Sequence, residues 1–430
     1  MSFDKIIERK GTCCIKADGL MKHYGREDLI SLWIADMDFE SPACVKEALQ
    51  KVVDAGVYGY NTIPDEYFPA IKGWLASEHS WDVEEQWLTF IPGIVKGIGF
   101  AINHFTKEGD GIIIQPPVYP PFRNVPQMNG RKVVYNPLIK NENYTCGNST
   151  EGMPYYMDFE SLEEIGKEGS CKMLVLSNPH NPGGISWDRE SLVKLAQICH
   201  KYGILVVSDE IHADMPLFGG KHIPFATVSK EAEAISITFG APSKTFNIAG
   251  IVSSFAVVPN AQLREPFYKW LTANEMNSPT IFATTAAIAA YTQGDSWRKG
   301  MLQYIEENIL FTEKFFADLC ADSIQADSCS TQLESCSTQL DSRSSQLIIP
   351  IRPQSSFLVW LDCRNLCSRL GMNHDQLVDL FVNKAKLALN SGTAFGPGGE
   401  GFMRLNVGSS RELLEKAYTQ LKEQVLSLLK

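Results

Sequence analysis

The run Phe239-Gly-Ala-Pro-Ser-Lys-Thr-Phe-Asn247 governs the interpretation of the whole chain, because it sets one lysine among apolar residues. Phe239, Phe246 and Ile248 flank Lys244 in the sequence. An apolar environment disfavours the ammonium form, so it lowers the pKa of an amine and suits a nucleophile. A surface lysine is the ordinary interpretation of a Ser-Lys pair. The polar segments on either side of this run favour a reactive lysine instead.

Three further segments carry polar residues in a defined order. Upstream lie Ser177-Asn-Pro-His-Asn-Pro-Gly-Gly184 and Ser208-Asp-Glu-Ile-His212, and downstream lies Phe402-Met-Arg-Leu-Asn406. Together with Lys244 they supply the groups that a pyridoxal phosphate site requires. The lysine forms a Schiff base, Asp209 keeps the pyridinium nitrogen protonated, and Asn181 bonds the ring hydroxyl. Arg404 then binds the substrate carboxylate with its planar fork.

Each of these residues also has a structural interpretation. Asp209 can cap a helix or form an ion pair, and Arg404 can form a salt bridge within the protein. Asn181 lies in a segment rich in turn residues. His180, in the same segment, receives no role and is expected to point to solvent. The ordered set favours the functional interpretation of the other three residues.

Composition and charge exclude several classes of protein. The chain has 430 residues, of which 44% are hydrophobic, and a formal net charge of −11. It is long enough for a major and a minor domain. The acidic balance argues against nucleic acid and anionic membrane surfaces as partners. Eleven cysteines show no metal-ligand spacing, so no metal is expected, and the thiols are those of a reduced compartment. The N-terminus has no apolar signal region, and we expect a cytoplasmic protein.

The pattern of apolar runs predicts an α/β fold. Short apolar runs at 111–115, 172–176, 204–208, 235–239 and 251–258 are typical of buried strands. Helical patterns cover 41–56, which precedes these runs, and 188–202, which lies between two of them. Such alternation predicts a largely parallel sheet flanked by helices, and ligands bind beyond the carboxyl ends of its strands. Asn181, Asp209 and Lys244 follow directly after three of these runs.

Two further segments can complete the site. Pro92-Gly-Ile-Val-Lys-Gly97 opens a helix after an apolar run, and the free N–H groups of a helix start bind phosphate. Tyr119 lies in Pro116-Pro-Val-Tyr-Pro-Pro121, where it can stack on a cofactor ring. A structural tyrosine and an ordinary glycine turn are the alternatives.

Residues 322–347 differ from the rest of the chain. Cys329-Ser-Thr-Gln-Leu-Glu-Ser335 is nearly repeated as Cys336-Ser-Thr-Gln-Leu-Asp-Ser342. Only one apolar leucine recurs in each seven residues, whereas a coiled coil requires two apolar positions. We therefore expect a solvated low-complexity insertion, preceded by a helix at 297–319 and followed by a strand at 357–361.

These motifs resemble those of fold-type I pyridoxal-phosphate enzymes of the aminotransferase superfamily. The narrower resemblance is to the cystathionine β-lyase branch of MalY/PatB type. It rests on Ile34-Ala-Asp-Met-Asp-Phe39, Gly56-Val-Tyr-Gly-Tyr60, Ser208-Asp-Glu-Ile-His212, the lysine run and the segment around Arg404. The resemblance implies a large cofactor domain at 49–290. It also implies a small α+β domain formed by 1–48 and 291–430.

The resemblance also implies roles for individual residues. Gly93, Ile94, Val95 and Ser243 would hold the phosphate, and Tyr119 would stack on the ring. The enzyme would be a homodimer in which Tyr60 reaches the phosphate bound by the partner subunit.

Two departures from typical aminotransferases favour the lyase branch. His212 stands where a tyrosine is usual, and Val252 stands where a phosphate-binding arginine is common. A packed core histidine is the alternative for His212, but we expect it to contact the cofactor. The expected reaction is α,β-elimination from L-cystathionine or related cysteine S-conjugates, with Lys244 as the base. An aminotransferase that uses a 2-oxo acid is the second hypothesis, and a regulatory protein that retains the cofactor is the third.

Overall fold

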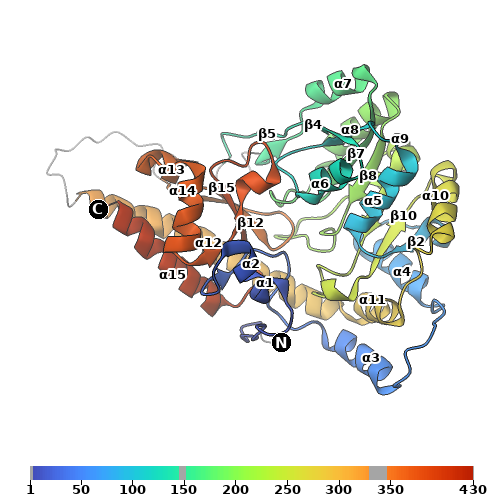
Figure 1. The fold of residues 1–430 in the computed structure, drawn as a ribbon, viewed down its shortest axis with the longest axis horizontal. Coiled ribbons are helices and arrows are strands. Elements are labelled where there is room, and N and C mark those ends of the chain that lie inside the picture. The colour runs from blue at the N-terminus through green and yellow to red at the C-terminus, as the bar shows by residue number, and fades with distance from the viewer. Residues whose placement is uncertain (1–2, 145–151, 329–345, 430) are drawn as a thin grey trace.

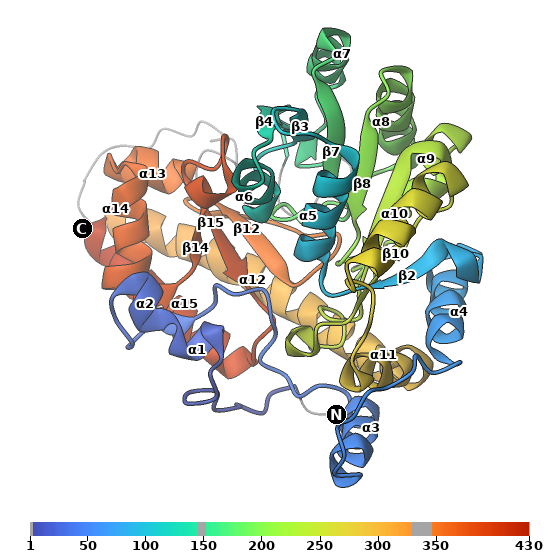
Figure 2. The same cartoon turned by 45° about the vertical axis from the view of Figure 1, so that its right-hand side comes forward.

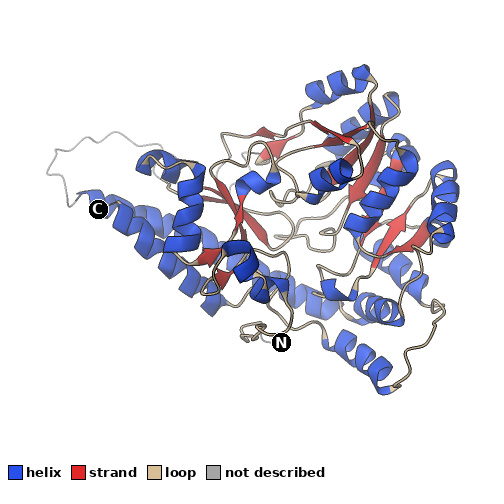
Figure 3. Cartoon of the chain, viewed as in Figure 1, coloured by secondary structure: helices blue, strands red, loops and turns tan. Residues whose placement is uncertain are grey.

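A seven-stranded sheet forms the larger part of the molecule. The computed structural model describes residues 3–144, 152–328 and 346–429. The strands lie in the interior and helices surround them (Figure 3). The order across the sheet is β2-β10-β9-β8-β7-β3-β4, and β10 alone runs antiparallel to its neighbours. The predicted, largely parallel sheet is therefore confirmed. The strands are β2 (Leu88–Ile91), β3 (Gly111–Ile114), β4 (Lys132–Tyr135), β7 (Cys171–Ser177), β8 (Leu205–Asp209), β9 (Ser236–Gly240) and β10 (Ser254–Val257).

Two layers of helices cover the two faces of this sheet, because both faces of its strands are apolar. Ile112 and Ile114 of β3 pack in one hydrophobic cluster, with side chains of α5 (Ile94–Phe105), α6 (Pro121–Met128) and α10 (Ala261–Ala273). Ile113 packs in another cluster, with side chains of α7 (Phe159–Glu168), α8 (Arg189–Lys201) and α9 (Lys230–Ile235). Successive side chains of a strand point to opposite faces, which accounts for this division. Figure 2 shows the helices around the strands.

The two ends of the chain meet in a second, smaller assembly. The antiparallel sheet β11-β12-β15-β14 consists of Ile349–Ile351, Leu358–Asp362, Phe402–Asn406 and Asn390–Ser391. Near the N-terminus, β1 (Ile30–Ser31) pairs in parallel with β13 (Leu387–Ala388). Helix α12 (Asp295–Ser328) begins beside α11 and runs from the large sheet into this assembly (Figure 1). The remaining helices are α1 (Ile15–Asp18), α2 (Leu20–Tyr24), α3 (Ala43–Asp54), α4 (Tyr67–His79), α11 (Ile281–Gln293), α13 (Arg364–Leu370), α14 (His374–Asp379) and α15 (Arg411–Leu428).

The boundaries of the two expected domains stay predictions. Residue 49 lies within α3 and residue 290 lies within α11. The pairing of β1 with β13 is consistent with a small domain that takes residues from both chain ends.

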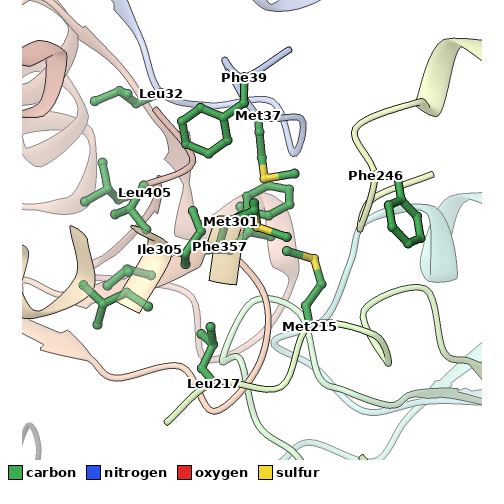
Figure 4. Close-up of a cluster of buried hydrophobic side chains, with 14 of the residues drawn as sticks. Leu32, Met37, Phe39, Met215, Leu217, Phe246, Met301, Ile305, Phe357 and Leu405 are labelled. Atoms are coloured by element: carbon green, nitrogen blue, oxygen red, sulfur yellow. The ribbon is translucent and has the colours of Figure 1, made fainter. Parts of the chain in front are cut away.

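One hydrophobic cluster joins the N-terminal segment to both sheets. Met37 and Phe39 pack with Met215, which follows β8, and with Phe357, which precedes β12 (Figure 4). Met301 of α12 completes this group. The N-terminal segment is therefore packed between the two parts of the molecule rather than lying on one of them.

The limits of the low-complexity insertion require correction. Residues 322–328 belong to helix α12, in which Ser323 is fully buried. Leu347 is also buried, and its carbonyl oxygen accepts a hydrogen bond from the backbone N–H of Leu366. The expectation of a solvated segment is therefore wrong at Ser323 and at Leu347, because both side chains pack inside the protein. The repeat at 329–345 lies outside the described residues.

No helix of the described chain is both long enough and apolar enough to cross a membrane. Two stretches of the sequence, 245–263 and 276–294, contain no charged residue, and they contribute to β10 and α11.

Candidate active site

A cavity of about 300 Å³ lies at the carboxyl ends of β7, β8 and β9, where the sequence places its polar segments. Loops that leave the strands expose their side chains and backbone donors at this edge. Nine of the predicted site residues line the cavity, and they come from segments far apart in the chain. They are Gly93, Ile94, Val95, Tyr119, Asn181, Asp209, His212, Ser243 and Lys244.

Lys244 lies in the turn after β9, and its amine points into the cavity. Its Nζ donates a hydrogen bond to the carbonyl oxygen of Ala35, at 2.6 Å. Burial lowers the pKa of Lys244, while the carboxylates of Asp36 and Asp209 act in the opposite direction. The net lowering makes the neutral amine, which is the form that attacks a carbonyl and accepts a proton, easier to reach than it is for a lysine in water.

Asp209 ends β8 and is buried in the cavity wall. Its Oδ1 accepts a hydrogen bond from the backbone N–H of Ile211, at 3.1 Å. No cationic side chain of the described chain forms a salt bridge with it, so the structural ion pair considered above is absent. Burial raises the pKa of Asp209 to about 7, although its hydrogen bond and Lys244 lower it. A buried carboxylate without a cationic partner costs folding free energy, and a cationic ligand would remove much of that cost.

Arg404 of β15 is a buried cation that lacks an acidic partner among the described residues. Its Nη1 donates to Asn181 Oδ1 at 3.0 Å, and its Nη2 donates to the carbonyl oxygen of Trp33 at 3.0 Å and to Asn390 Oδ1 at 2.7 Å. The buried Nε has no partner. Burial lowers the pKa of Arg404 to about 10. Neutral oxygens and the ring of Phe395, whose centroid lies 4.9 Å from Arg404 Cζ, hold this guanidinium, so it retains capacity for an anion.

Arg404 itself is not part of the cavity wall, and Asn181 connects it to that wall. Asn181 lines the cavity, and its backbone N–H donates to Ser177 Oγ at 3.1 Å. The amide oxygen of Asn181 accepts from Arg404, which leaves the amide NH₂ group to donate to a ligand. An amino acid bound between Lys244 and Arg404 would therefore lie beside Asn181.

The start of α5 provides backbone donors at another side of the cavity. Gly93 precedes the helix with φ of 105°, a conformation that favours glycine, and the space where its Cβ would lie is open. At Gly97 a Cβ would lie 2.9 Å from Ile91 Cγ2, so the helix packs directly on β2. This contact fixes the helix start, where unpaired N–H groups and the helix dipole favour an anion.

The two histidines of the predicted segments are both buried. His212 lines the cavity, and burial lowers its pKa to about 3. Its Nδ1 has no hydrogen-bond partner and is available to a ligand. The expectation that His180 points to solvent is wrong. Its ring packs near Trp187, with centroids 5.7 Å apart, and its Nδ1 accepts from the N–H of Gly183.

A buried polar layer behind the cavity escaped prediction from the sequence. Glu210 accepts hydrogen bonds from Ser208 Oγ at 2.8 Å, from the N–H of Phe225 at 2.9 Å and from His222 Nε2 at 2.8 Å. Asp214 binds Trp74 Nε1 at 2.8 Å and His79 Nε2 at 2.7 Å. Asp209 and His212 face the cavity while Glu210 and Asp214 anchor the other side of the same turn. The acidic residues at 209–214 were a signal of this layer in the sequence. Their distant partners could not be identified from the sequence.

Residues 33–39, which we call the bridging segment, also lacked a predicted role. Asn247 Nδ2 donates to the carbonyl oxygens of Met37 at 2.9 Å and Phe39 at 2.7 Å. Asn406 Nδ2 donates to the carbonyl oxygens of Ile34 at 2.6 Å and Asp36 at 2.7 Å. The bridging segment in turn offers the carbonyl oxygens of Ala35 and Trp33 to Lys244 and Arg404.

Ion pairs hold the acidic side chains of the bridging segment away from the cavity. Arg9 pairs with Asp36 at 2.8 Å and with Asp38 at 2.9 Å. The buried Lys16 also pairs with Asp38, at 2.8 Å. These carboxylates are therefore neutralised locally, and the backbone carbonyls are left to face the site.

Tyr60 and Val252 occupy different positions relative to the cavity. Tyr60 is fully exposed and does not line the cavity of its own chain. Val252 lines the cavity and is 40% exposed, with φ of 57°. A β-branched residue in this left-handed conformation is an outlier, and such strain is concentrated at functional sites.

This combination of sheet, second assembly and cavity defines an enzyme of the pyridoxal-phosphate-dependent transferase fold, type I. The model of the family "Aminotransferase class I and II" matches residues 27–421, and the chain belongs to that family. Cystathionine beta-lyase PatB of Bacillus subtilis (strain 168) is 38% identical over 422 residues, which cover 98% of this chain and 99% of that protein.

Two solved structures share the fold closely. Cystalysin from Treponema denticola, which contains pyridoxal 5'-phosphate, superposes with a TM-score of 0.86 at 29% identity, over 99% of both chains. The C–S lyase from Staphylococcus hominis, bound to the same cofactor, gives a TM-score of 0.84 at 26% identity. The match covers 99% of this chain and 98% of that chain.

The raised pKa of Asp209 predicts that Asp209→Asn stabilises the cofactor-free protein in a pH-dependent way. The folded state binds the proton more tightly than the unfolded state, so the stability that Asp209 contributes falls as pH rises from about 4 to about 7. Asparagine removes this loss. We expect the gain in free energy of unfolding to be roughly 2 kcal/mol larger at pH 8 than at pH 5. Urea unfolding at both pH values measures it, and an equal effect at both would contradict the assignment.

Proposed function

We propose that the cavity holds pyridoxal 5'-phosphate and that the protein is a carbon–sulfur β-lyase acting on L-cystathionine or related cysteine S-conjugates. The observation that carries the proposal is that the partly buried Lys244 and the buried Asp209 and Arg404 all lack an ion-pair partner among the described residues. Pyridoxal phosphate and an amino-acid carboxylate supply the missing partners. The PatB relative and the two C–S lyases support the choice of reaction.

The side chains fit this cofactor in chemistry. Lys244 would bond to its aldehyde, and Asp209 would pair with its ring nitrogen. The amide of Asn181 and the free Nδ1 of His212 would face its polar edge, while Tyr119 would stack on the ring. The phosphate would bind the backbone N–H groups at Gly93, Ile94 and Val95 and the hydroxyl of Ser243.

The residues of this chain then perform an α,β-elimination. Arg404 binds the α-carboxylate with two N–H groups and so orients the Cα–H bond of the substrate. Once the substrate amine has replaced it on the cofactor aldehyde, the released Lys244 amine would accept the Cα proton, which its lowered pKa favours. Bound pyridoxal phosphate supplies an electron-poor ring that takes up the electron pair left at Cα. The Cβ–S bond breaks, and the thiolate leaves with its electron pair. Water hydrolyses the remaining enamine to pyruvate and ammonia.

An aminotransferase is the second candidate, because the same groups catalyse the first proton transfer and the family carries that name. The two reactions differ in their need for an acceptor. The third candidate is a regulatory protein that only retains the cofactor. It ranks last because such a protein would not require both a base and a carboxylate receptor.

The assembly proposed for the active enzyme is a homodimer in which Tyr60 completes the phosphate site of the partner subunit. Tyr60 is fully exposed within a stretch where Val57 and Tyr58 are exposed as well. Such an apolar patch is typical of a protein interface.

The purified protein, supplied with L-cystathionine and no oxo acid, is expected to produce homocysteine, pyruvate and ammonia in equal amounts over many turnovers. Lys244→Ala should abolish product formation together with the near-visible absorbance of the lysine-linked cofactor. Arg404→Ala should reduce kcat/KM mainly through KM, by roughly 100-fold, because the carboxylate contact exists before and during the reaction. Product assays and steady-state kinetics measure both effects. Sustained turnover only with an added oxo acid, and without a thiol, would identify a transaminase instead.

Tyr60→Phe is expected to weaken retention of pyridoxal phosphate by roughly tenfold while the dimer persists, because it removes one hydroxyl donor to the phosphate. Equilibrium dialysis gives the affinity and sedimentation gives the assembly. Tyr58→Phe, in the same exposed stretch, is the matched control and should change neither. A monomer that bound the cofactor with full affinity would rule out the shared site.

A further inference from the structure

The charges around the cavity leave the phosphate group incompletely balanced. Of the residues that line the cavity, Lys96, Asp209 and Lys244 are formally charged, since the lowered pKa of His212 keeps its ring neutral. Lys244 is committed to the cofactor aldehyde, and Asp209 to the ring nitrogen. A phosphate monoester carries a charge of roughly −1.5 to −2 at neutral pH. The rest of the cavity wall provides only neutral hydroxyls and backbone N–H groups to the phosphate.

Lys96 is placed to supply the missing positive charge. It is the third residue of α5, directly after Ile94 and Val95, and it belongs to the cavity wall. The Cα–Cβ bonds of a helix tilt towards its N-terminus, so the side chain of Lys96 leans back towards the helix start rather than away from it. Lys96 is an exposed residue at the rim of the cavity, and no acidic side chain of the described residues forms an ion pair with it.

A second, independent observation points to a ligand in the same wall. Ser253 lines the cavity, is 1% exposed, and its Oγ has no hydrogen bond. Burial raises the pKa of Tyr67 and the nearby Ser253 hydroxyl acts in the opposite direction, yet neither hydroxyl forms a hydrogen bond of acceptable geometry. A buried hydroxyl without a partner is costly, and a phosphate oxygen would satisfy it. The neighbouring Val252 contributes no charge to this wall.

We propose that Lys96 is the cationic ligand of the cofactor phosphate in this protein, and that Ser253 assists it as a hydroxyl donor. The inference rests on the proposed function, because it requires pyridoxal phosphate as the occupant of the cavity. Lys96 thereby binds the anion as a point charge, next to the directed N–H groups of the helix start.

The test compares two probes that differ only in the phosphate, pyridoxal 5'-phosphate and pyridoxal, on the full chain freed of cofactor. Lys96→Met should raise the Kd for pyridoxal phosphate by roughly three- to tenfold and leave the Kd for pyridoxal within about twofold. Affinity of the wild type for pyridoxal phosphate should also fall more steeply with salt than that of the variant. Lys107→Met removes the same charge from an exposed position just after α5, and it should behave as wild type.

Rescue distinguishes a charge effect from damage to the helix. Val252→Arg in the Lys96→Met background returns a cation to the same cavity, and it should recover most of the lost affinity for pyridoxal phosphate. Ser253→Ala should weaken pyridoxal phosphate and spare pyridoxal. An equal loss for both probes, or an unchanged Kd with a raised KM for L-cystathionine, would overturn the assignment of Lys96. Failure of the wild type to bind either probe would instead overturn the proposed function.

Discussion

Two asparagine side chains, Asn247 and Asn406, hold the bridging segment in place, and the geometry of the site depends on that hold. Asn247 belongs to the lysine turn of the large sheet, whereas Asn406 belongs to β15 of the smaller one. Between them the segment presents one carbonyl oxygen to Lys244 and another to Arg404. The base and the carboxylate receptor come from different parts of the fold, and a single stretch of backbone sets their relation. Hydrogen bonds to backbone carbonyls fix the positions of Lys244 and Arg404 without adding a countercharge, so both side chains stay available to ligands.

The site also holds ionisable side chains away from water without giving them a partner of opposite charge. Burial raises the pKa of Asp209, lowers that of Lys244 and lowers that of Arg404, each towards the neutral form. These shifts cost folding free energy, and they are concentrated where ligands of the opposite charge would bind. Two other buried charged residues do have side-chain partners, because Lys16 pairs with Asp38 and Glu210 accepts hydrogen bonds from Ser208 and His222. The contrast separates groups that hold the structure from groups that await a ligand.

The sequence predicted the parts of the site that follow from strand order. Asn181, Asp209 and Lys244 follow successive apolar runs, and the rule for parallel sheets brings such positions to one edge. The helix start at Gly93 was predictable for the same reason. Residues whose roles depend on distant partners were not predictable. The Asn406 contacts join residues at least 370 positions apart, and no local pattern encodes that pairing. His180 was assigned to solvent because the composition of a turn does not reveal the packing that buries the ring. The edges of the serine-rich repeat were misjudged because composition alone does not show where packing begins.

The most direct test of this account is a double-mutant cycle on the two asparagines. Asn247→Gly preserves the positive φ of 54° at that position, and Asn406→Ala removes the other contact. Because both side chains fix one segment, each single variant should lower kcat/KM for elimination by roughly tenfold, and the double variant should lose little more than either alone. Thermal unfolding of the loaded proteins would serve as the control for stability. Strictly multiplicative losses in kcat/KM would contradict the account, since they would mean that the two asparagines act on the site independently.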